Sequence, residues 1–219
     1  MKRLKIPDPP LLFVTDRSQA RQPLPAIAVA ALKAGCRWMS LREKDMAEVD
    51  LILLARRLLP LTRSAGARLL LHGEPSLAKL AGVDGVHLPA GADTAAARAL
   101  LGAEKLIGVS IHTVIEAEAI NENSADYALA GPAFETPSKP GYGPEIGRKG
   151  LAEIARAARV PVLAIGGVNA ARIAELIAAG AAGVAVMGGV MRAPDPAQEV
   201  SGLLASLRGA LAITAPGRY

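Results

Sequence analysis

The sequence predicts an α/β fold and, within that class, a single-domain (β/α)8 TIM barrel over residues 1–219. Eight short apolar segments alternate with Ala- and Leu-rich amphipathic stretches, which is the pattern of a parallel sheet whose strands are joined by helices. Eight strands close such a barrel, and a chain of 219 residues suits a small one. A doubly wound open sheet is the alternative, but no Gly-x-Gly-x-x-Gly motif follows the first apolar segment. We therefore favour the barrel.

The predicted strands are short and rich in aliphatic residues. Strands buried on both faces of a parallel sheet have such continuous apolar runs. The eight segments cover residues 11–15, 36–41, 68–71, 84–88, 105–110, 126–130, 161–165 and 183–187.

The predicted helices fill most of the intervals between these strands. They cover residues 24–34, 46–65, 93–101, 114–122, 149–158, 169–179 and a last stretch near 196–210. Only the connection after the third strand is short, in the run EPSLAKLA. No linker or low-complexity segment divides the chain, so we expect one domain.

Composition excludes several classes of protein. Hydrophobic residues make up 51% of the chain, enough for a sizeable core, but no apolar run reaches the roughly 18 residues of a membrane helix. The basic N-terminus lacks the apolar segment of a signal peptide, so we expect a cytoplasmic protein with no membrane partner. The single Cys36 excludes an internal disulfide framework and a cysteine metal cluster.

The net charge of +5 favours an anionic partner. Aromatic residues are only 3% of the chain, too few for the stacking platforms that bind single-stranded nucleic acid. No run of Lys and Arg exceeds two residues. We therefore expect a small anionic substrate, such as a phosphorylated metabolite, and no nucleic acid.

Polar side chains follow the first two predicted strands, at the end of a barrel where catalytic loops lie. Asp16 and Arg17 are candidates for substrate binding and, equally, for an ion pair or a helix cap. Ser40, Arg42 and Lys44 share one face of an extended chain, because they are two residues apart. The two cations would clamp an anion, Arg as a planar fork and Lys as a point charge. The alternatives are a solvated pair at the rim and a bridge from Lys44 to the acidic residue after it.

Three histidines lie at or near the next strand ends. His72 follows the third predicted strand, while His87 lies within the fourth, where a hydrogen-bonded core residue is the more common role. After the fifth strand, Ser110 can bond an anion, and either Ser110 or His112 is a candidate general acid or base. Asp93 is a natural helix N-cap, and that role explains it at least as well as metal binding.

Glycine pairs follow the seventh and eighth predicted strands, in AIGGV and VAVMGGV. The pairs are Gly166–Gly167 and Gly188–Gly189. Glycine lets backbone N–H groups approach a phosphate closely, and barrels often bind phosphate between these two loops. A single pair would also suit a tight turn, but two pairs at these places favour a phosphate site.

These motifs resemble the thiamine phosphate synthase/TenI family. The resemblance runs through nearly the whole chain, in the order VTDR, LREK, GVHL, GVSIH, DYALAGPAFETPSK, PVLAIGGV and GVAVM. It implies a (β/α)8 barrel and an enzyme of thiamine biosynthesis. The synthase of this family joins hydroxymethylpyrimidine diphosphate to a thiazole phosphate, with Mg²⁺, and releases pyrophosphate. The resemblance also suggests a homo-oligomer.

The resemblance implies binding roles for individual residues. Arg42 and Lys44 would contact the pyrimidine diphosphate, with Ser110 on the pyrophosphate. Lys139 would help these cations to stabilise the leaving diphosphate.

The same resemblance extends to the loops after the sixth to eighth strands. Thr136 and Ser138, with the lysine that follows, match the family's T-x-T-K loop and would hold phosphate groups. Gly167 and the Gly188–Gly189 turn would bind the thiazole phosphate.

The sequence departs from the synthase pattern mainly around the metal. The run His72-Gly73 replaces an Asn-Asp pair whose carboxylate helps to hold Mg²⁺, and Mg²⁺ prefers oxygen ligands. Asp93 matches the next acidic position only with a one-residue shift, so at most Asp93 remains from the magnesium site. Ser40 also replaces a Gln, and Gly188 replaces a usual Ser.

Other local features are closer to TenI: LPAG after the fourth strand, FET before the lysine loop, and Gly73. TenI-type proteins include a thiazole tautomerase whose acid/base His follows the sixth strand. Here Pro132 occupies that position, so His112 or His72 would have to move the proton. Three functions stay open: a synthase, a tautomerase, and a non-catalytic, regulatory protein that binds phosphate ligands. A sugar phosphate isomerase is a more distant fourth.

Overall fold

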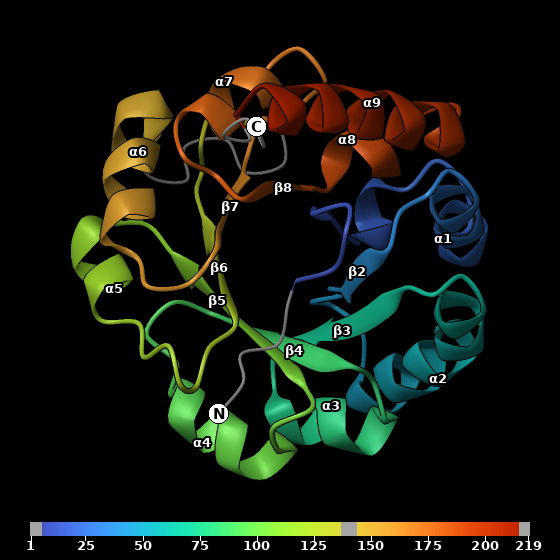
Figure 1. Ribbon diagram of the computed structural model, residues 1–219. Coiled ribbons are helices and arrows are strands. Elements are labelled where there is room, and N and C mark those ends of the chain that lie inside the picture. The colour runs from blue at the N-terminus through green and yellow to red at the C-terminus, as the bar shows by residue number, and fades with distance from the viewer. Residues whose placement is uncertain (1–5, 137–143, 215–219) are drawn as a thin grey trace.

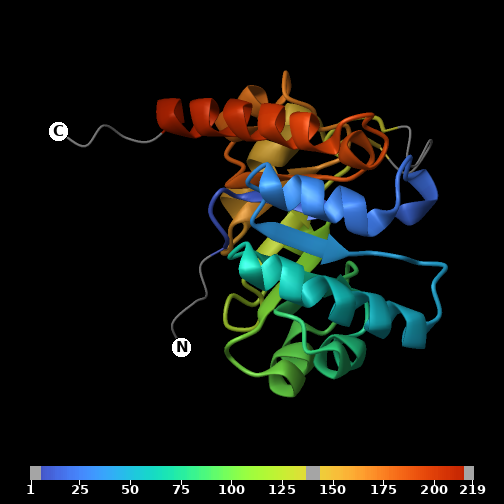
Figure 2. The same ribbon diagram turned by 90° about the vertical axis from the view of Figure 1, so that its right-hand side faces the viewer.

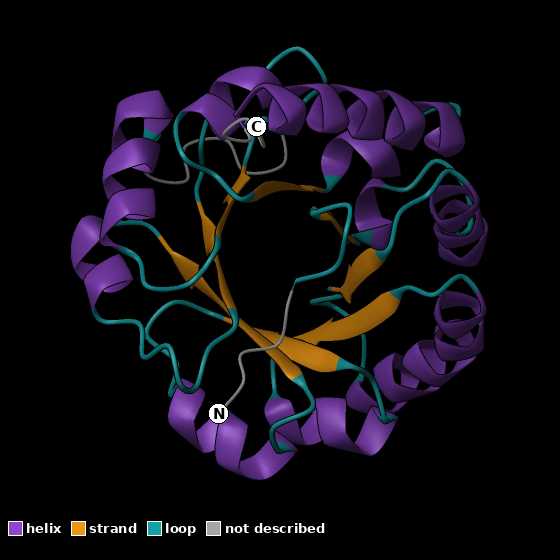
Figure 3. Ribbon diagram, viewed as in Figure 1, coloured by secondary structure: helices purple, strands orange, loops and turns teal. Residues whose placement is uncertain are grey.

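The structure of the protein is a computed structural model that describes residues 6–136 and 144–214. Eight parallel strands form a closed barrel in which each strand is hydrogen-bonded to the next, and β8 pairs with β1. Helices surround the barrel (Figures 1 and 3). The predicted (β/α)8 barrel is confirmed, and the pairing of β1 with β8 excludes an open sheet.

The strands occupy the predicted apolar segments within a few residues at each end. They are β1 (Leu11–Val14), β2 (Trp38–Leu41), β3 (Arg68–His72), β4 (Gly85–Leu88), β5 (Leu106–Ile111), β6 (Tyr127–Ala130), β7 (Val162–Ile165) and β8 (Gly183–Val186).

The helices follow the strands in order. They are the 3-10 turn η1 (Arg17–Gln19), α1 (Leu24–Lys33), α2 (Glu48–Ser64), α3 (Pro75–Ala81), α4 (Thr94–Leu101), α5 (Val114–Glu118), α6 (Gly147–Ala157), α7 (Ile173–Ala178), α8 (Gly188–Met191) and α9 (Pro196–Thr214). None of these described helices combines the length and the apolar character that a membrane span requires.

Several helices differ from the prediction: α5 ends at Glu118 and not at residue 122, and α8 was not predicted. The short run EPSLAKLA forms α3, which begins at Pro75, ends at Ala81 and is capped by Gly82 in the left-handed conformation. Helix α7 begins four residues later than predicted, because Asn169 accepts the Arg172 N–H with both its backbone and side-chain oxygens and so forms a turn.

The core has two layers, because alternate residues of each strand face the lumen and the helices. The lumen cluster comprises Leu12, Val14, Trp38, Leu70, Leu106, Tyr127, Leu129, Leu163 and Ala185. The rings of Trp38 and Tyr127 meet edge to face at 4.6 Å although β2 and β6 are not neighbours, so they touch across the lumen. Ile6 packs against this cluster from the N-terminal side. The lumen is therefore filled, and the opposite ends of the strands remain for the site.

In Figure 2 the strand β2, drawn as a blue arrow, runs from left to right, so the strands begin on the left side of this view. The carboxyl ends of the strands, with the loops that follow them, lie on the other side. We call this end of the barrel the mouth.

Candidate active site

Inward-facing positions change from apolar to polar where the strands reach the mouth. In β2 the fully buried Trp38 is followed on the same face by Ser40, and the next such position is Arg42. In β4 the corresponding inward residue is His87, also fully buried. The period of two thus lines the mouth with polar side chains above an apolar floor.

Arg42 spans the mouth from the end of β2 to the end of β8. Its guanidinium Nη1 lies 3.6 Å from the Asp16 Oδ2 atom and 3.8 Å from the sulfur of Met187, the residue before the second glycine pair. The side chain is only 11% exposed. The cation of the predicted clamp is therefore held at the mouth, close to the turn after β8.

Asp16 is part of the same network. Its carboxylate accepts hydrogen bonds from the Ser18 hydroxyl at 2.6 Å and the Gln19 amide at 2.7 Å. Partial burial raises the pKa of the Asp16 carboxyl, but the hydrogen bonds from Ser18 and Gln19 and the charge of Arg42 outweigh it, so the pKa is lowered. The carboxylate caps η1 and pairs with Arg42, so the predicted cap and an ion pair are both present.

Glu43, which sequence reasoning did not single out, holds the ends of β1 and β2 together. Its side chain is fully buried, and it accepts the Thr15 hydroxyl at 2.6 Å and the Arg17 backbone N–H at 2.8 Å. The Thr15 oxygen in turn accepts the Arg42 backbone N–H at 3.0 Å. Arg42 therefore leaves the strand from a fixed backbone. The signal in the sequence is a single acid between two cations in LREK.

Lys44 is exposed at the rim. Asp45 does not bridge to it, because both oxygens of Asp45 accept the guanidinium of Arg17, at 2.6 and 3.0 Å. Within the described part of the chain Lys44 has no ion-pair partner. Arg17 thus forms its ion pair with Asp45 and not with the neighbouring Asp16, and Lys44 remains available to an anion.

A buried chain of hydrogen bonds crosses from β6 to β5 through β4. His87 Nδ1 lies 3.1 Å from the Tyr127 hydroxyl, and His87 Nε2 lies 2.9 Å from Ser110 Oγ. His87 is a hydrogen-bonded core residue, as expected. Burial, and to a lesser degree the neighbouring His72, lower the pKa of His87 well below 6.5.

His72 packs against this chain. Its ring centroid lies 4.8 Å from that of His87, and the two residues are paired across β3 and β4. The N–H of Gly73 donates to the His87 carbonyl at 2.9 Å.

Tyr127 was missed by sequence reasoning, although DYALA places a tyrosine at the start of the sixth strand.

The first glycine pair has a steric reason to be glycine. Gly166 and Gly167 have φ of 99° and 62°, in the left-handed region. A Cβ on Gly166 would lie 2.8 Å from the Pro132 Cα, and one on Gly167 would lie 2.7 Å from the Glu135 carbonyl oxygen. This pair lets the loop after β6 pack directly on the loop after β7.

The second pair is less constrained. A Cβ on Gly189 would meet only Glu199 Oε1, at 3.5 Å, which is an ordinary contact. Gly188 and Gly189 open the short helix α8 beside Met187. Packing therefore explains Gly189 less well than the Gly166–Gly167 pair, and close approach of a ligand stays a prediction for it.

The loop after β6 is described only as far as Thr136, which is half-buried. Arg172 fastens this loop to β7: its guanidinium lies 4.3 Å over the Phe134 ring and donates to the Gly167 carbonyl at 3.0 Å. The predicted phosphate ligands Ser138 and Lys139 lie outside the described residues.

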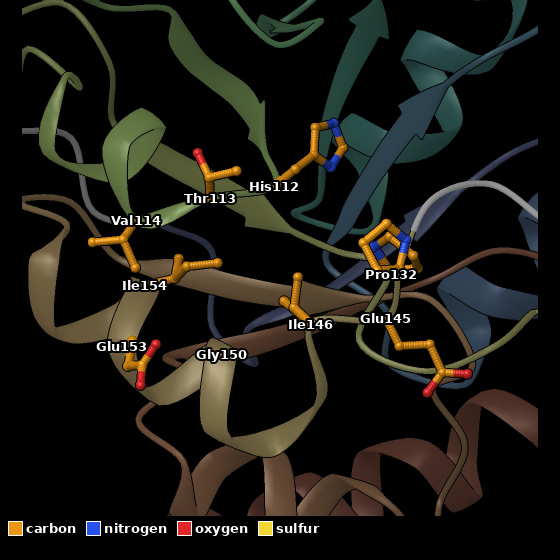
Figure 4. Close-up of a pocket in the computed structure, with 10 residues that line it drawn as sticks. His112, Thr113, Val114, Pro132, Glu145, Ile146, Gly150, Glu153 and Ile154 are labelled. Atoms are coloured by element: carbon orange, nitrogen blue, oxygen red, sulfur yellow. The ribbon is translucent and has the colours of Figure 1, made fainter.

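His112 lines a pocket of about 580 Å³ at the side of the mouth, between α5 and α6 (Figure 4). Its Nδ1 lies 2.6 Å from the Gly131 carbonyl oxygen. Because a carbonyl oxygen only accepts, His112 Nδ1 is the donor of this hydrogen bond. Pro132 and Glu145 line the same pocket, so His112 lies beside the position that the tautomerase His would occupy.

Asp93 does not form a metal centre with its neighbours. Its Oδ1 accepts the N–H groups of Ala95 and Ala96, at 2.9 and 3.0 Å, and caps α4. Within residues 6–136 and 144–214, no group of three or more His, Cys, Asp or Glu side chains could hold a metal ion. These residues do not fit a Mg²⁺ site built by the protein alone.

Comparison with known proteins identifies relatives across the whole barrel. A family model described as thiamine monophosphate synthase matches residues 11–190. A thiamine-phosphate synthase of Roseiflexus sp. (strain RS-1) is 43% identical over 202 residues, which are 90% of this chain and 85% of the relative. A putative thiamine-phosphate synthase of Geobacter sulfurreducens is 44% identical, with 90% and 93% covered. The solved thiamine phosphate pyrophosphorylase of Pyrococcus furiosus superposes with a TM-score of 0.82 at 28% identity, covering 92% of this chain and 96% of that one.

Proposed function

The chain belongs to the thiamine monophosphate synthase family, and on that premise we propose that it joins hydroxymethylpyrimidine diphosphate to a thiazole phosphate. The products are thiamine phosphate and pyrophosphate. Relatives named thiamine-phosphate synthase at 43% identity support this proposal over the other functions that the sequence leaves open.

One observation carries the proposal: the contact of Arg42 with Met187 places a cation next to the glycine pair after β8. A diphosphate on Arg42 and a phosphate at Gly188–Gly189 would then share one mouth. Two phosphorylated substrates held side by side react as if at high local concentration.

The protein's contribution to the reaction is electrostatic. The C–O bond of the pyrimidine diphosphate breaks, its electron pair leaves with pyrophosphate, and the ring-bound carbon becomes a cation that the thiazole nitrogen attacks. Negative charge grows on the leaving group, so preorganised cations stabilise this transition state most. Arg42 and Lys44 take that role, joined by Lys139, while Ser110 donates a hydrogen bond to the pyrophosphate. Thr136 and Ser138 would hold phosphate oxygens.

The described residues do not fit a Mg²⁺ site built by the protein alone. The cations of the chain neutralise the diphosphate instead.

A thiazole tautomerase is the second candidate. The position of His112 supports it, because this side chain lines a pocket together with Pro132, which occupies the place of the tautomerase His. The variant His112→Ala tests this role: it should abolish deuterium exchange at the thiazole of a tautomerase and leave the exchange unchanged otherwise. His72→Ala is the matched variant for the other candidate histidine.

The direct experiment supplies both substrates to the purified protein, with and without Mg²⁺, and measures thiamine phosphate and pyrophosphate. We expect one pyrophosphate for each thiamine phosphate formed. Lys139→Ala should strongly lower the rate at which both products form. Unchanged pyrophosphate release in that variant would remove Lys139 from the mechanism. Tight binding of the thiazole phosphate with no product would instead support a non-catalytic, regulatory protein.

A further inference from the structure

We propose that His87 is a positioning residue that, together with Tyr127, fixes the Ser110 hydroxyl as a hydrogen-bond donor to a phosphate oxygen of the ligand. The inference rests on the proposed function only in placing a phosphate-bearing ligand at the mouth. It adds a role for two residues of the lumen that touch no ligand themselves.

The hydrogen-bonded row of Tyr127, His87 and Ser110 is fixed in place at its tyrosine end. Tyr127 is fully buried between the Trp38 ring and the backbone of Gly108, with which it is paired across β5 and β6. A Cβ on Gly108 would lie 2.0 Å from the tyrosine ring, so only glycine leaves room for this position. The Tyr127 hydroxyl is therefore held at a fixed place, 3.1 Å from His87 Nδ1.

The second step is the direction of the first hydrogen bond. His87 Nδ1 is the hydrogen-bond partner of the Tyr127 hydroxyl among the described residues. If Nδ1 carried the proton, the proton of the fully buried tyrosine hydroxyl would have no acceptor among the described residues, which is costly. Tyr127 therefore donates and His87 Nδ1 accepts.

The third step fixes the tautomer. Burial lowers the pKa of His87 and raises the pKa of Tyr127, so both are neutral near pH 7. A neutral imidazole has one N–H, and with Nδ1 accepting, that N–H is on Nε2. His87 Nε2 then donates to Ser110 Oγ, 2.9 Å away.

The last step concerns Ser110. One lone pair of its oxygen is taken by His87, so its own proton is free to point elsewhere. Ser110 is partly exposed at the end of β5, on the mouth side of fully buried His87. The hydroxyl thus offers a donor to the ligand, which suits an ionised phosphate oxygen, an acceptor.

The test begins with the unsubstituted protein. The chain has three histidines, and isotope-labelled imidazole signals in a long-range nitrogen–proton spectrum report the tautomer of each. His87→Gln assigns the His87 signals. We expect His87 in the Nε2–H form, and Tyr127→Phe should remove that preference while it leaves the ring in place. An Nδ1–H form in the unsubstituted protein would overturn the inference.

The second arm measures the binding of inorganic pyrophosphate by calorimetry. Ser110→Ala should weaken binding by about 10- to 100-fold, the range for a hydrogen bond to a charged group. His87→Leu should lose a similar factor, and the double variant no more than either alone. His87→Gln, whose amide N–H2 can still donate to Ser110, should restore most of the affinity.

Losses that multiply in the double variant would mean that the two residues act independently and would overturn the inference, as would pyrophosphate binding that does not depend on Ser110. The tautomer and the binding data do not require turnover. If they come out as expected but both substrates give no thiamine phosphate, the proposed function fails and the role of His87 stands.

Discussion

The two sides of the barrel mouth differ in the chemical groups that they present to an anion. On the side of β1, β2 and β8, charge is held by charge: Asp16 pairs with Arg42, and buried Glu43 fixes the backbone from which Arg42 projects. On the side of β3 to β6, neutral groups are hydrogen-bonded in a row, from Tyr127 in β6 through His87 in β4 to Ser110 in β5.

The β3–β4 side offers Mg²⁺ few oxygen ligands of the kind that it prefers. The β3–β4 side carries histidines and an aspartate whose carboxylate caps a helix. The cation that the proposal assigns to the diphosphate comes from the other side, from Arg42.

The largest effect is expected for Arg42→Ala. Loss of a preorganised group that stabilises the leaving pyrophosphate should lower turnover by about 10²- to 10³-fold, as measured by pyrophosphate release. The turnover of Arg42→Lys should lie between that of the wild type and that of Arg42→Ala, because lysine keeps the charge but lacks the planar guanidinium fork. Wild-type turnover in Arg42→Ala would mean that the charged side of the mouth is not where catalysis occurs.

The next prediction compares two carboxylates that both bind Arg17. Glu43→Ala should lower the free energy of unfolding by about 2–3 kcal/mol, because it leaves buried donors unpaired. Asp45→Ala removes an ion pair at the surface, where Asp45 is 67% exposed, and should cost about 0–1 kcal/mol. Denaturant unfolding of the two variants checks this, and equal losses would contradict the role given to Glu43.

A smaller effect concerns pH. The pKa of Asp16 is lowered below 3.8 in the folded protein, so its ionised form stabilises the fold. That contribution is present above the unfolded pKa and is lost as the pH falls through the lower folded pKa. Unfolding curves measured from neutral pH to below pH 3.8 should therefore show a loss in the wild type that is smaller in Asp16→Asn. Identical acid dependence of the two proteins would show that the Asp16 carboxylate gains no net stabilisation from Ser18, Gln19 and Arg42 in the folded protein.

The smallest effect is expected for Asp93→Asn. Asn caps a helix as well as Asp, so stability should change by no more than a few tenths of a kcal/mol, while Asp93→Ala should cost about 1 kcal/mol. Turnover of Asp93→Asn, and its response to added Mg²⁺, should match the wild type. A selective loss of the Mg²⁺ response in this variant would restore Asp93 as a metal ligand.

Local patterns in the sequence predict much of this molecule. The apolar runs place all eight strands, because buried parallel strands are continuous in composition, and the period of two places Ser40 and Arg42 on one face. The glycine pairs identify the turns after β7 and β8. The cap formed by Asp93 follows from its position before a helix.

What the sequence does not reveal are contacts made only when the barrel closes. His87 and Tyr127 are 40 residues apart, and Thr15 and Glu43 are 28 apart, so no local period relates them. Helix α3 is two turns long and gives little periodic signal, which is why EPSLAKLA reads as a short connection. The steric need for Gly167 likewise comes from a different loop, at Glu135.

The most direct test of an anion site built from the protein's own cations is calorimetry with pyrophosphate in the presence of a chelator. Pyrophosphate should bind the wild type without divalent metal, and Arg42→Ala should weaken that binding by about tenfold or more, as expected for a charge-assisted contact. Binding that requires Mg²⁺ and is the same in Arg42→Ala would contradict it.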